Sequence, residues 1–564
     1  MNILLQSRQV IEQLLAELFQ VEATSFAHIA VTINTDKDRS FGDISTNAAM
    51  VVAKNLKKNP REVAEKLQQA LLQSSFGEFL ENVNVAGPGF LNILFTAHAW
   101  HNQLLLMHKQ QADYFKQIGK PKLRYLLEYV SANPTGPLHL GGGRGGIIGD
   151  VIANVLKFQG HEVSREYYIN DAGNQVKLLG ASFKARCLQQ LGVNAEFPEG
   201  GYAGEYLIAV AQECVAEHGV SLTEQSDDFF ITYAKDKLIA VVKKDLIDYG
   251  VSYDSWFSEK SLHTDGSVAQ ALLELEKKDL AYEKDGALWF KAEQFGDAKD
   301  RVLRKSSGEM TYIAADVAYH KNKFDRGYDR LIDILGQDHH GYVTRLKATM
   351  QALGYPAENL DVIVYQLVTI KENEVAVRMS KRAGNFTQLS DVVDTVGKDC
   401  ARFFYLNRKA DAHLEFDLGV ALKKTEENPV FYIQYAYVRT GSVLAKAEQE
   451  ELLKQYVAQF VPGQDLEKVL FADYSMTEQD YALMRKIVSF TEILAAITHS
   501  YQTHVLAYYA LELAQVFHNY YAHNRVIELN DIAASRFRLF MIVRVRMLLA
   551  LSLDLLGLDK PERM

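Results

Sequence analysis

The chain has 564 residues and a mass of 63.6 kDa, too many for a single hydrophobic core, which predicts roughly three or four domains. Hydrophobic residues make up 48% and charged residues 23%, a composition that excludes disordered, collagen-like and mucin-like chains. The formal net charge of −10 gives no support to a nonspecific nucleic-acid binder, so a polyanionic partner would have to meet local basic patches.

Three features of the sequence predict a cytoplasmic protein without membrane association. The three cysteines are far apart and form no C-x-x-C pair, which argues against a disulfide framework or a cysteine zinc site. Residues 1–19 lack the basic and apolar regions of a signal peptide. The most apolar stretch, 541–558, contains Arg544, Arg546 and Asp554, whose charges favour a soluble core helix over a membrane span.

Residues 1–115 mix helical and strand-like patterns and predict a small α+β domain. Helical periodicity covers 10–19 and 47–73, with a break expected at Asn59-Pro60, and alternation over 82–95 predicts strands. The basic run between Lys54 and Lys66 is by default a solvated helix face and less often a phosphate contact.

Residues 116–408 predict a Rossmann-like domain with a parallel sheet. A buried strand at 124–130 precedes a Pro- and Gly-rich loop, a helix at 146–158 and a strand at 162–168; further strands are expected at 331–335 and 362–368. Ligands should therefore bind at the carboxyl ends of these strands. Residues 180–294 are mostly helical in pattern and predict insertions into this domain.

Residues 409–564 predict an all-α helix bundle, with helices over 420–450, 477–499, 504–522 and 532–556. The aromatic residues of this region are core residues by default, although some could stack on bases. The expected fold class is a multidomain α/β chain: a Rossmann-like parallel-sheet domain with insertions, an N-terminal α+β domain and a C-terminal helix bundle.

The segment Ser131–Gly146 is rich in glycine and lies between a predicted strand and a predicted helix, a position where backbone N–H groups bind anions. Gly141, Gly143 and Gly146 match G-x-G-x-x-G, and Glu166 follows 20 residues after Gly146. A nicotinamide-dependent oxidoreductase is therefore one alternative. A glycine-rich turn that only allows a helix to pack closely on a strand is another.

A second basic loop, 377–386, follows a strand-like segment and precedes a helix expected near Ser390. Two phosphate-binding loops at one sheet are more specific than either alone. In these loops the chain resembles class I aminoacyl-tRNA synthetases. His139-Leu-Gly-Gly142 occupies the place of their His-Ile-Gly-His signature, and Arg378-Met-Ser-Lys381 that of Lys-Met-Ser-Lys. Gly142 and Arg378 depart from the family pattern: Gly142 removes a side-chain donor near the ATP phosphates, whereas Arg378 keeps the positive charge.

Longer segments resemble bacterial-type arginyl-tRNA synthetases, namely 128–139, 165–175 and 561–564. Residues 41–47 and 85–92 are similar to the additional domain that this family uses against the tRNA elbow. The resemblance implies an arginine–tRNA ligase that binds ATP with Mg²⁺, L-arginine and the tRNA for arginine. We expect a monomer. A noncatalytic tRNA-binding paralogue, disabled at Gly142, remains an alternative.

The resemblance also implies roles for individual residues. For catalysis it implies His139, Arg378, Ser380 and Lys381. For ATP it implies Pro137, His139, Gly141, Gly142, Gly336, Asp338, His339, Met379 and Lys381. For arginine it implies Glu128, Ser131, Asn133, Tyr312, Asp316 and Gln337. For tRNA it implies Phe90, Asn92, Tyr432, Tyr435, Arg439 and Met564.

The chemistry of arginine agrees with this assignment, because a guanidinium needs an acceptor-only planar partner such as a carboxylate. Tyr312 and Asp316 are spaced i, i+4 on a helix predicted over 311–324, so both side chains can face one pocket. By resemblance Asp316 binds the guanidinium. Without the resemblance a surface tyrosine beside a solvated aspartate would be favoured. Adjacent histidines rarely face the same way, so His339-His340 predicts no zinc site, and no metal site is expected.

Overall fold

The computed structural model describes residues 2–35, 38–117, 121–372, 375–376, 388–460, 466, 471 and 473–564. The chain divides into two compact units. The terminal unit comprises Met1–Lys120, Lys424–Tyr501 and Val505–Met564, and the central unit comprises Pro121–Lys423 and Gln502–His504. The domain boundaries expected near residues 115 and 408 stay predictions.

The N-terminal part of the terminal unit is an α+β fold, as predicted. Its antiparallel sheet has the order β1-β2-β4-β3, formed by Val31–Ile33, Ile44–Thr46, Phe90–Phe95 and Leu80–Ala86. The helices are α1 (Ile3–Phe19), α2 (Ala48–Leu56), α3 (Pro60–Gln73) and α4 (Ala97–Gln110). The break expected at Asn59-Pro60 is confirmed: Asn59 caps α3 and Pro60 occupies its first turn, where no N–H is needed.

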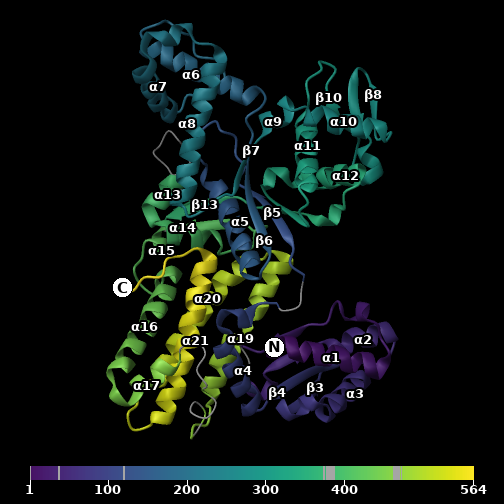
Figure 1. Cartoon of the computed structure of the whole chain (residues 1–564), viewed down its shortest axis with the longest axis vertical. Helices are drawn as coiled ribbons and strands as arrows, with labels where there is room; N and C mark the ends of the chain where they lie inside the picture. The colour runs from purple at the N-terminus through teal and green to yellow at the C-terminus, as the bar shows by residue number, and fades with distance from the viewer. Residues whose placement is uncertain are drawn as a thin grey trace. The chain divides into compact units, whose positions relative to one another are not determined.

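The C-terminal part of the terminal unit is helical, as predicted. Its helices are α16 (Pro429–Gln449), α17 (Glu451–Gln459), α19 (Glu478–Ser500), α20 (His504–His523) and α21 (Ile532–Leu556). Helices α16 and α21 pack side by side (Figure 1). Across the described ranges, no helix has the length and apolar character needed to cross a membrane.

The central unit is built on a parallel sheet with the order β12-β11-β5-β6-β7. Its strands are β5 (Arg124–Tyr129), β6 (Glu162–Ile169), β7 (Ser255–Ser258), β11 (Arg330–Gly336) and β12 (Leu360–Tyr365). This is the predicted Rossmann-like topology, in which the direction of winding changes between β5 and β11 and ligands bind beyond the strand ends. Strand β7 was not predicted, because it is short and lies within the segment expected to be helical.

Helices and smaller sheets complete the central unit. An insertion of helices α6 (Asn174–Gln190), α7 (Glu205–His218) and α8 (Asp227–Asp248) has its own apolar core. Around the sheet lie α5 (Leu140–Phe158), α9 (Glu259–Thr264), α10 (Ser267–Lys277), α11 (Tyr312–Asp325), α12 (Val343–Leu353), α13 (Leu389–Val396) and α14 (Lys398–Tyr405).

Two small sheets flank these helices. Strands β8 (Ala281–Lys284), β9 (Ala287–Phe290) and β10 (Arg301–Arg304) form an antiparallel sheet that the prediction of mostly helical insertions missed. Strands β13 (Val368–Glu372), β14 (Val375–Ala376) and β15 (Leu414–Asp417) form a mixed sheet, in which β13 is antiparallel to β14 and parallel to β15. Helix α15 (Leu418–Ala421) follows β15.

Helix α5 begins at Leu140, so the prediction of a loop reaching Gly146 was wrong. The glycines lie in the first turns of the helix, where their low helix propensity is overridden by close packing. A Cβ at Gly145 would lie 2.6 Å from the Tyr365 ring, and one at Gly149 would lie 2.4 Å from the Tyr129 ring. The glycine run therefore lets α5 approach the aromatic residues of the sheet.

Candidate active site

The carboxyl end of β5 is shaped by an unusual backbone turn. Val130 and Ser131 have φ values of +71° and +40°, which are rare for residues other than glycine and strained for a β-branched side chain. The Tyr168 amide donates a hydrogen bond of 3.1 Å to the Ser131 hydroxyl, and the Tyr167 hydroxyl donates one of 3.2 Å to the Ala132 carbonyl. Strand β6 thus fixes the turn after β5.

His139 is the N-cap of α5, with Nδ1 accepting a hydrogen bond of 3.1 Å from the Gly141 amide. Its side chain is exposed, and Pro137 before it is half-buried. Among the described residues, a Cβ at Gly142 would meet only the Val130 side chain, at 3.7 Å, and no positive φ requires glycine there. Within this part of the chain, the missing histidine of the class signature therefore leaves space at a helix N-terminus that can bind anions.

The residues that follow the second basic loop in the sequence lie beside this signature. The Leu389 amide donates a hydrogen bond of 2.9 Å to the Leu138 carbonyl, and Gln388 pairs with His139 in an antiparallel bridge. The predicted residues Arg378, Met379, Ser380 and Lys381 lie outside the described residues. The structure thus places Gln388, two residues after the predicted loop 377–386, against His139.

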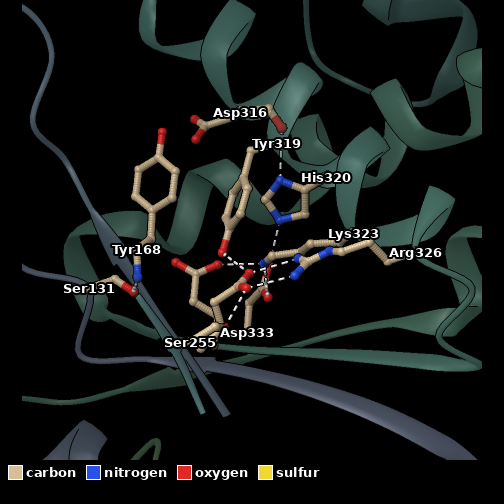
Figure 2. Close-up of polar contacts among 11 residues, drawn as sticks. Ser131, Tyr168, Ser255, Asp316, Tyr319, His320, Lys323, Arg326 and Asp333 are labelled. Carbon is tan, nitrogen blue, oxygen red and sulfur yellow. Dashed lines mark hydrogen bonds and ion pairs between the residues drawn. The ribbon is translucent and has the colours of Figure 1, made fainter. Parts of the chain in front are cut away.

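A row of polar side chains crosses the sheet beneath α11. Asp333, Glu128, Glu166 and Ser255 lie in register on β11, β5, β6 and β7. Because α11 lies over this face, its side chains meet a row of three carboxylates. The basic residues of α11 pair with all three (Figure 2).

Lys323 holds two of these carboxylates together. Its Nζ lies 2.5 Å from Glu128 and 2.7 Å from Asp333, and its side chain is 0% exposed. His320 adds a contact of 2.6 Å to Asp333. Burial raises the pKa of Glu128 although Lys323 opposes the shift, whereas Lys323 and His320 together outweigh burial and lower the pKa of Asp333.

Arg326 holds the third carboxylate. Its guanidinium forms a bidentate pair with Glu166, with distances of 2.7 and 2.8 Å. The hydroxyls of Tyr319 and Ser255 also donate to Glu166, at 2.7 and 2.8 Å. These contacts of Glu166 therefore attach α11 and Arg326 to the sheet. The alternative of a nicotinamide-dependent oxidoreductase needs Glu166 as the acidic residue that follows the glycine motif, so these contacts argue against it.

Asp316 projects from the opposite end of α11. Its carboxylate accepts a hydrogen bond from the Tyr342 hydroxyl, and burial raises its pKa although this bond acts against the shift. Tyr312 is 67% exposed. We expected Tyr312 and Asp316 to face one pocket, but the Tyr312 side chain is largely exposed. The tyrosine that hydrogen-bonds Asp316 is Tyr342.

Sequence reasoning missed Glu259, a second carboxylate near Asp316. It directly follows β7, its side chain is 8% exposed, and its pKa is raised by burial and by the charge of Asp316. Asp171 holds this junction by accepting hydrogen bonds from the Ser258 hydroxyl at 2.8 Å and the Lys260 amide at 3.0 Å. In the sequence, Glu259 directly follows Ser-Trp-Phe-Ser. An acidic residue at this position indicates a ligand-binding site only if these four residues form a strand of the sheet, and β7 was not predicted.

The two carboxylates suit a cation with many donors. Asp316 and Glu259 disfavour each other's charge, so a delocalised positive group between them would relieve both. Tyr168, whose phenol hydrogen-bonds Glu259, extends to the same end of the cluster as Asp316 (Figure 2). A guanidinium has five N–H donors and permanent charge, which match this pair.

The remaining predicted residues surround the ends of β5 and β11. Gly336 ends β11, and Gln337, Asp338 and His339 follow in the 3₁₀ segment Gln337–Tyr342, with Asp338 and His339 exposed. Asn133 donates a hydrogen bond of 2.7 Å to Gln175 at the start of α6. These residues and His139 follow adjacent strand ends of one sheet.

Among the described residues, Glu128, His320 and Asp333 place ligand atoms within 4.8 Å of one another and could in principle hold a metal ion. Lys323 already contributes a positive charge to two of these side chains. The group therefore fits an internal ion pair better than a divalent cation.

The residues predicted to bind tRNA lie in the terminal unit. Phe90 on β4 is 40% exposed, and Asn92 accepts a hydrogen bond of 2.8 Å from Ser45. Tyr435, Arg439 and Met564 line a cavity of about 900 Å³, and Tyr432 lines a neighbouring cavity of about 480 Å³ with Tyr435 and Arg439. The Arg439 guanidinium lies 4.4 Å from the Tyr435 ring centre. Such cation and aromatic surfaces can stack on bases.

Comparisons with known proteins cover all parts of the chain. Residues 102–411 match the family "tRNA synthetases class I (R), catalytic domain", residues 433–564 match "DALR anticodon binding domain", and residues 6–95 match "Arginyl tRNA synthetase N terminal domain".

Two curated relatives are named arginine–tRNA ligase. The one from Caldanaerobacter subterraneus is 42% identical over 95% of this chain and 94% of its own length, and the one from Solidesulfovibrio magneticus is 41% identical over 99% and 100%. The solved Thermus thermophilus arginyl-tRNA synthetase covers 100% of both chains with a TM-score of 0.75 at 21% identity, which supports the fold. With the class I signature at the head of α5 and these matches along its length, the chain belongs to the arginyl-tRNA synthetase family.

Proposed function

We propose that this chain is an arginine–tRNA ligase that uses Asp316 and Glu259 to select the arginine guanidinium. The proposal is carried by the placement of Glu259 at the start of α9 and Asp316 near the start of α11, because these two helices contact each other beyond the ends of the parallel sheet. A neutral or shorter side chain would leave these two carboxylates without a cationic donor between them, a cost that gives large discrimination.

We assign the α-amino and carboxylate groups of arginine to the turn after β5. Ser131 and Asn133 lie on this turn, and Glu128 lies one residue inside the strand end. Lys323 orients Glu128, so that its carboxylate has a fixed position below the α-amino site. Gln337 after β11 and Tyr312 at the head of α11 complete the set of arginine-binding residues that we propose.

ATP is assigned to the head of α5 and the segment after β11. The triphosphate would meet the α5 N-terminus with Pro137, His139, Gly141 and Gly142, and the nucleoside would meet Gly336, Asp338 and His339. The arginine carboxylate attacks the α-phosphate and pyrophosphate leaves, with Lys381, Arg378, Ser380 and Met379 on the loop assigned to the departing group. Mg²⁺ would arrive with the triphosphate and neutralise part of its charge.

The terminal ribose hydroxyl of the tRNA then accepts the arginyl group, and AMP leaves. We assign Phe90 and Asn92 to contacts with the tRNA elbow. The residues assigned to the bases that the C-terminal helices read are Tyr432, Tyr435, Arg439 and Met564. A cytoplasmic monomer is part of the same proposal.

Arginine-dependent pyrophosphate exchange with tRNA present tests the assignment. Asp316→Asn should lower kcat/KM for arginine by roughly 30-fold to several thousand-fold, because removing one partner of a desolvated charged pair costs about 2–5 kcal/mol. The KM for ATP should change little. Asp325→Asn, on the exposed end of α11, is the matched control and should behave like the parent.

An unchanged kcat/KM in Asp316→Asn would move the specificity carboxylate elsewhere. A parent protein that binds tRNA but gives no exchange would favour the alternative of a noncatalytic paralogue. Glu259→Gln should lower kcat/KM for arginine in the same direction as Asp316→Asn.

A further inference from the structure

Tyr342 contacts a residue of each proposed substrate subsite. Its hydroxyl donates a hydrogen bond to Asp316, the proposed guanidinium ligand. Its ring lies edge-on to the His339 ring, with centroids 6.3 Å apart and an angle of 84° between the planes. His339 belongs to the segment assigned to the nucleoside, so one side chain spans the distance between the arginine and nucleotide residues.

The ring of Tyr342 is held in place by charged neighbours. The Arg345 guanidinium lies 5.1 Å from the ring centre, and its Nε lies 3.7 Å from Asp297. Asp297 is itself fixed by two contacts from Arg301, at 2.8 and 2.6 Å. This support favours a single ring orientation that is suited to transmitting a displacement.

The backbone also connects the proposed nucleotide residues to Tyr342. Asp338, His339 and Tyr342 all belong to the 3₁₀ segment Gln337–Tyr342, which leads directly into α12. A nucleotide that fixes the exposed side chains of Asp338 and His339 would therefore also fix the backbone that carries Tyr342. Conversely, a guanidinium bound to Asp316 would share this carboxylate with the Tyr342 hydroxyl, because an ionised carboxylate accepts several hydrogen bonds.

We propose that Tyr342 is a positioning residue that couples arginine binding to nucleotide binding through its hydrogen bond to Asp316 and its contact with His339. The proposal rests on the function proposed above. Coupling of this kind is reciprocal: if the nucleotide strengthens arginine binding by some factor, arginine strengthens nucleotide binding by the same factor.

The test compares Tyr342→Phe with Tyr355→Phe in the full-length protein. Tyr355 is a matched control, because its hydroxyl donates a hydrogen bond of 2.5 Å to Asp325 at the exposed end of the same helix, α11. Each variant loses one hydroxyl and its hydrogen bond to an aspartate, and Tyr355→Phe also loses a bond of 3.2 Å that Tyr355 accepts from Lys321. The measurement is the Kd for arginine by calorimetry, without nucleotide and with a saturating non-hydrolysable ATP analogue.

In the parent and in Tyr355→Phe, the analogue should tighten arginine binding by about fivefold or more, within the usual range of coupling between two sites. In Tyr342→Phe, arginine should bind about tenfold more weakly without nucleotide, because the Asp316 carboxylate loses the hydroxyl that orients it toward the guanidinium. The ratio of the two Kd values should fall toward one. A purely structural role would instead weaken binding in both conditions and keep the ratio.

A parent ratio of one, or a parent-like ratio in Tyr342→Phe, would overturn the inference. Asp316→Asn separates this failure from failure of the proposed function. If Asp316→Asn weakens arginine binding while Tyr342→Phe keeps the parent ratio, only the coupling role is wrong. If Asp316→Asn has no effect on arginine binding, the proposed guanidinium site is wrong as well. Combining Asp316→Asn with Tyr342→Phe should produce no further loss of coupling, and a further loss would also overturn the inference.

Discussion

Replacing Lys323 with methionine should strongly destabilise the central unit. Lys323 is fully buried and contacts both Glu128 and Asp333, so methionine would leave two neighbouring carboxylates without their shared cation. Removing one partner of a buried ion pair typically costs about 3–5 kcal/mol. At about 2 °C per kcal/mol for a unit of this size, its melting transition should fall by about 6–10 °C.

Thermal melting followed by circular dichroism is the assay, with Lys321→Met as the matched control. Lys321 is on the same helix but pairs at the surface with Asp325, where a salt bridge contributes about 0–1 kcal/mol. The control should therefore melt within about 2 °C of the parent. Adding Asp333→Asn to Lys323→Met should recover part of the loss, because it removes one of the two neighbouring negative charges that Lys323 had neutralised. A Lys323→Met variant that melts with the control would refute the argument that this cation holds the two strands to α11.

Further predictions concern the glycine helix, the acidic row and the second loop. Gly142→His should keep the fold and the exchange activity, since an added Cβ meets its nearest neighbour at 3.7 Å, and a large loss of activity would contradict the free space described. Gly149→Ala should destabilise the central unit by about 1–3 kcal/mol in melting experiments, because its Cβ would lie 2.4 Å from the Tyr129 ring. Arg326→Gln should be less stable than the parent near neutral pH, and this difference in stability should disappear in acid. Burial alone would raise the pKa of Glu166, but the hydrogen bonds and the charge of Arg326 outweigh burial and lower that pKa. The contribution of that pair is thus present above the unfolded pKa of about 4.3 and is lost as pH falls through the lower folded value, which unfolding at several pH values can follow. Lys381→Ala should slow adenylate formation with little change in arginine affinity, because the charge it neutralises grows in the transition state; equal single-turnover rates would exclude this role.

The sequence predicted the parallel sheet well because its buried strands are continuous apolar runs that end in turn residues. Arg124–Tyr129 and Arg330–Gly336 are found where they were expected. The strand Ser255–Ser258 has only four residues, none of them fully buried, so periodicity gave no signal for it. Without this strand, Glu259 could not be placed at the end of the sheet.

The sequence motifs pointed to the region of the candidate active site, but they did not indicate which side chains contact one another there. His139 could be identified from the signature, but the start of α5 could not, because helix propensity disfavours the glycines that close packing requires. Likewise the resemblance to the family pointed to Asp316 as a ligand of the guanidinium, whereas nothing in the sequence pointed to Tyr342. Contact between residues 26 positions apart depends on tertiary structure, which local patterns do not encode.

The pairing of Leu389 with Leu138 acts as a tether for the loop that precedes it. Lys381 lies seven positions before Gln388 in the sequence, and Gln388 pairs with His139. An extended chain spans at most about 3.6 Å per residue, so a connection of seven residues reaches about 25 Å at most. If Lys381 has the role proposed above, a lysine on so short a connection would have an effective concentration in the millimolar range or above at the triphosphate. We therefore expect substitutions within the loop to alter the timing of pyrophosphate departure without releasing the loop from the site.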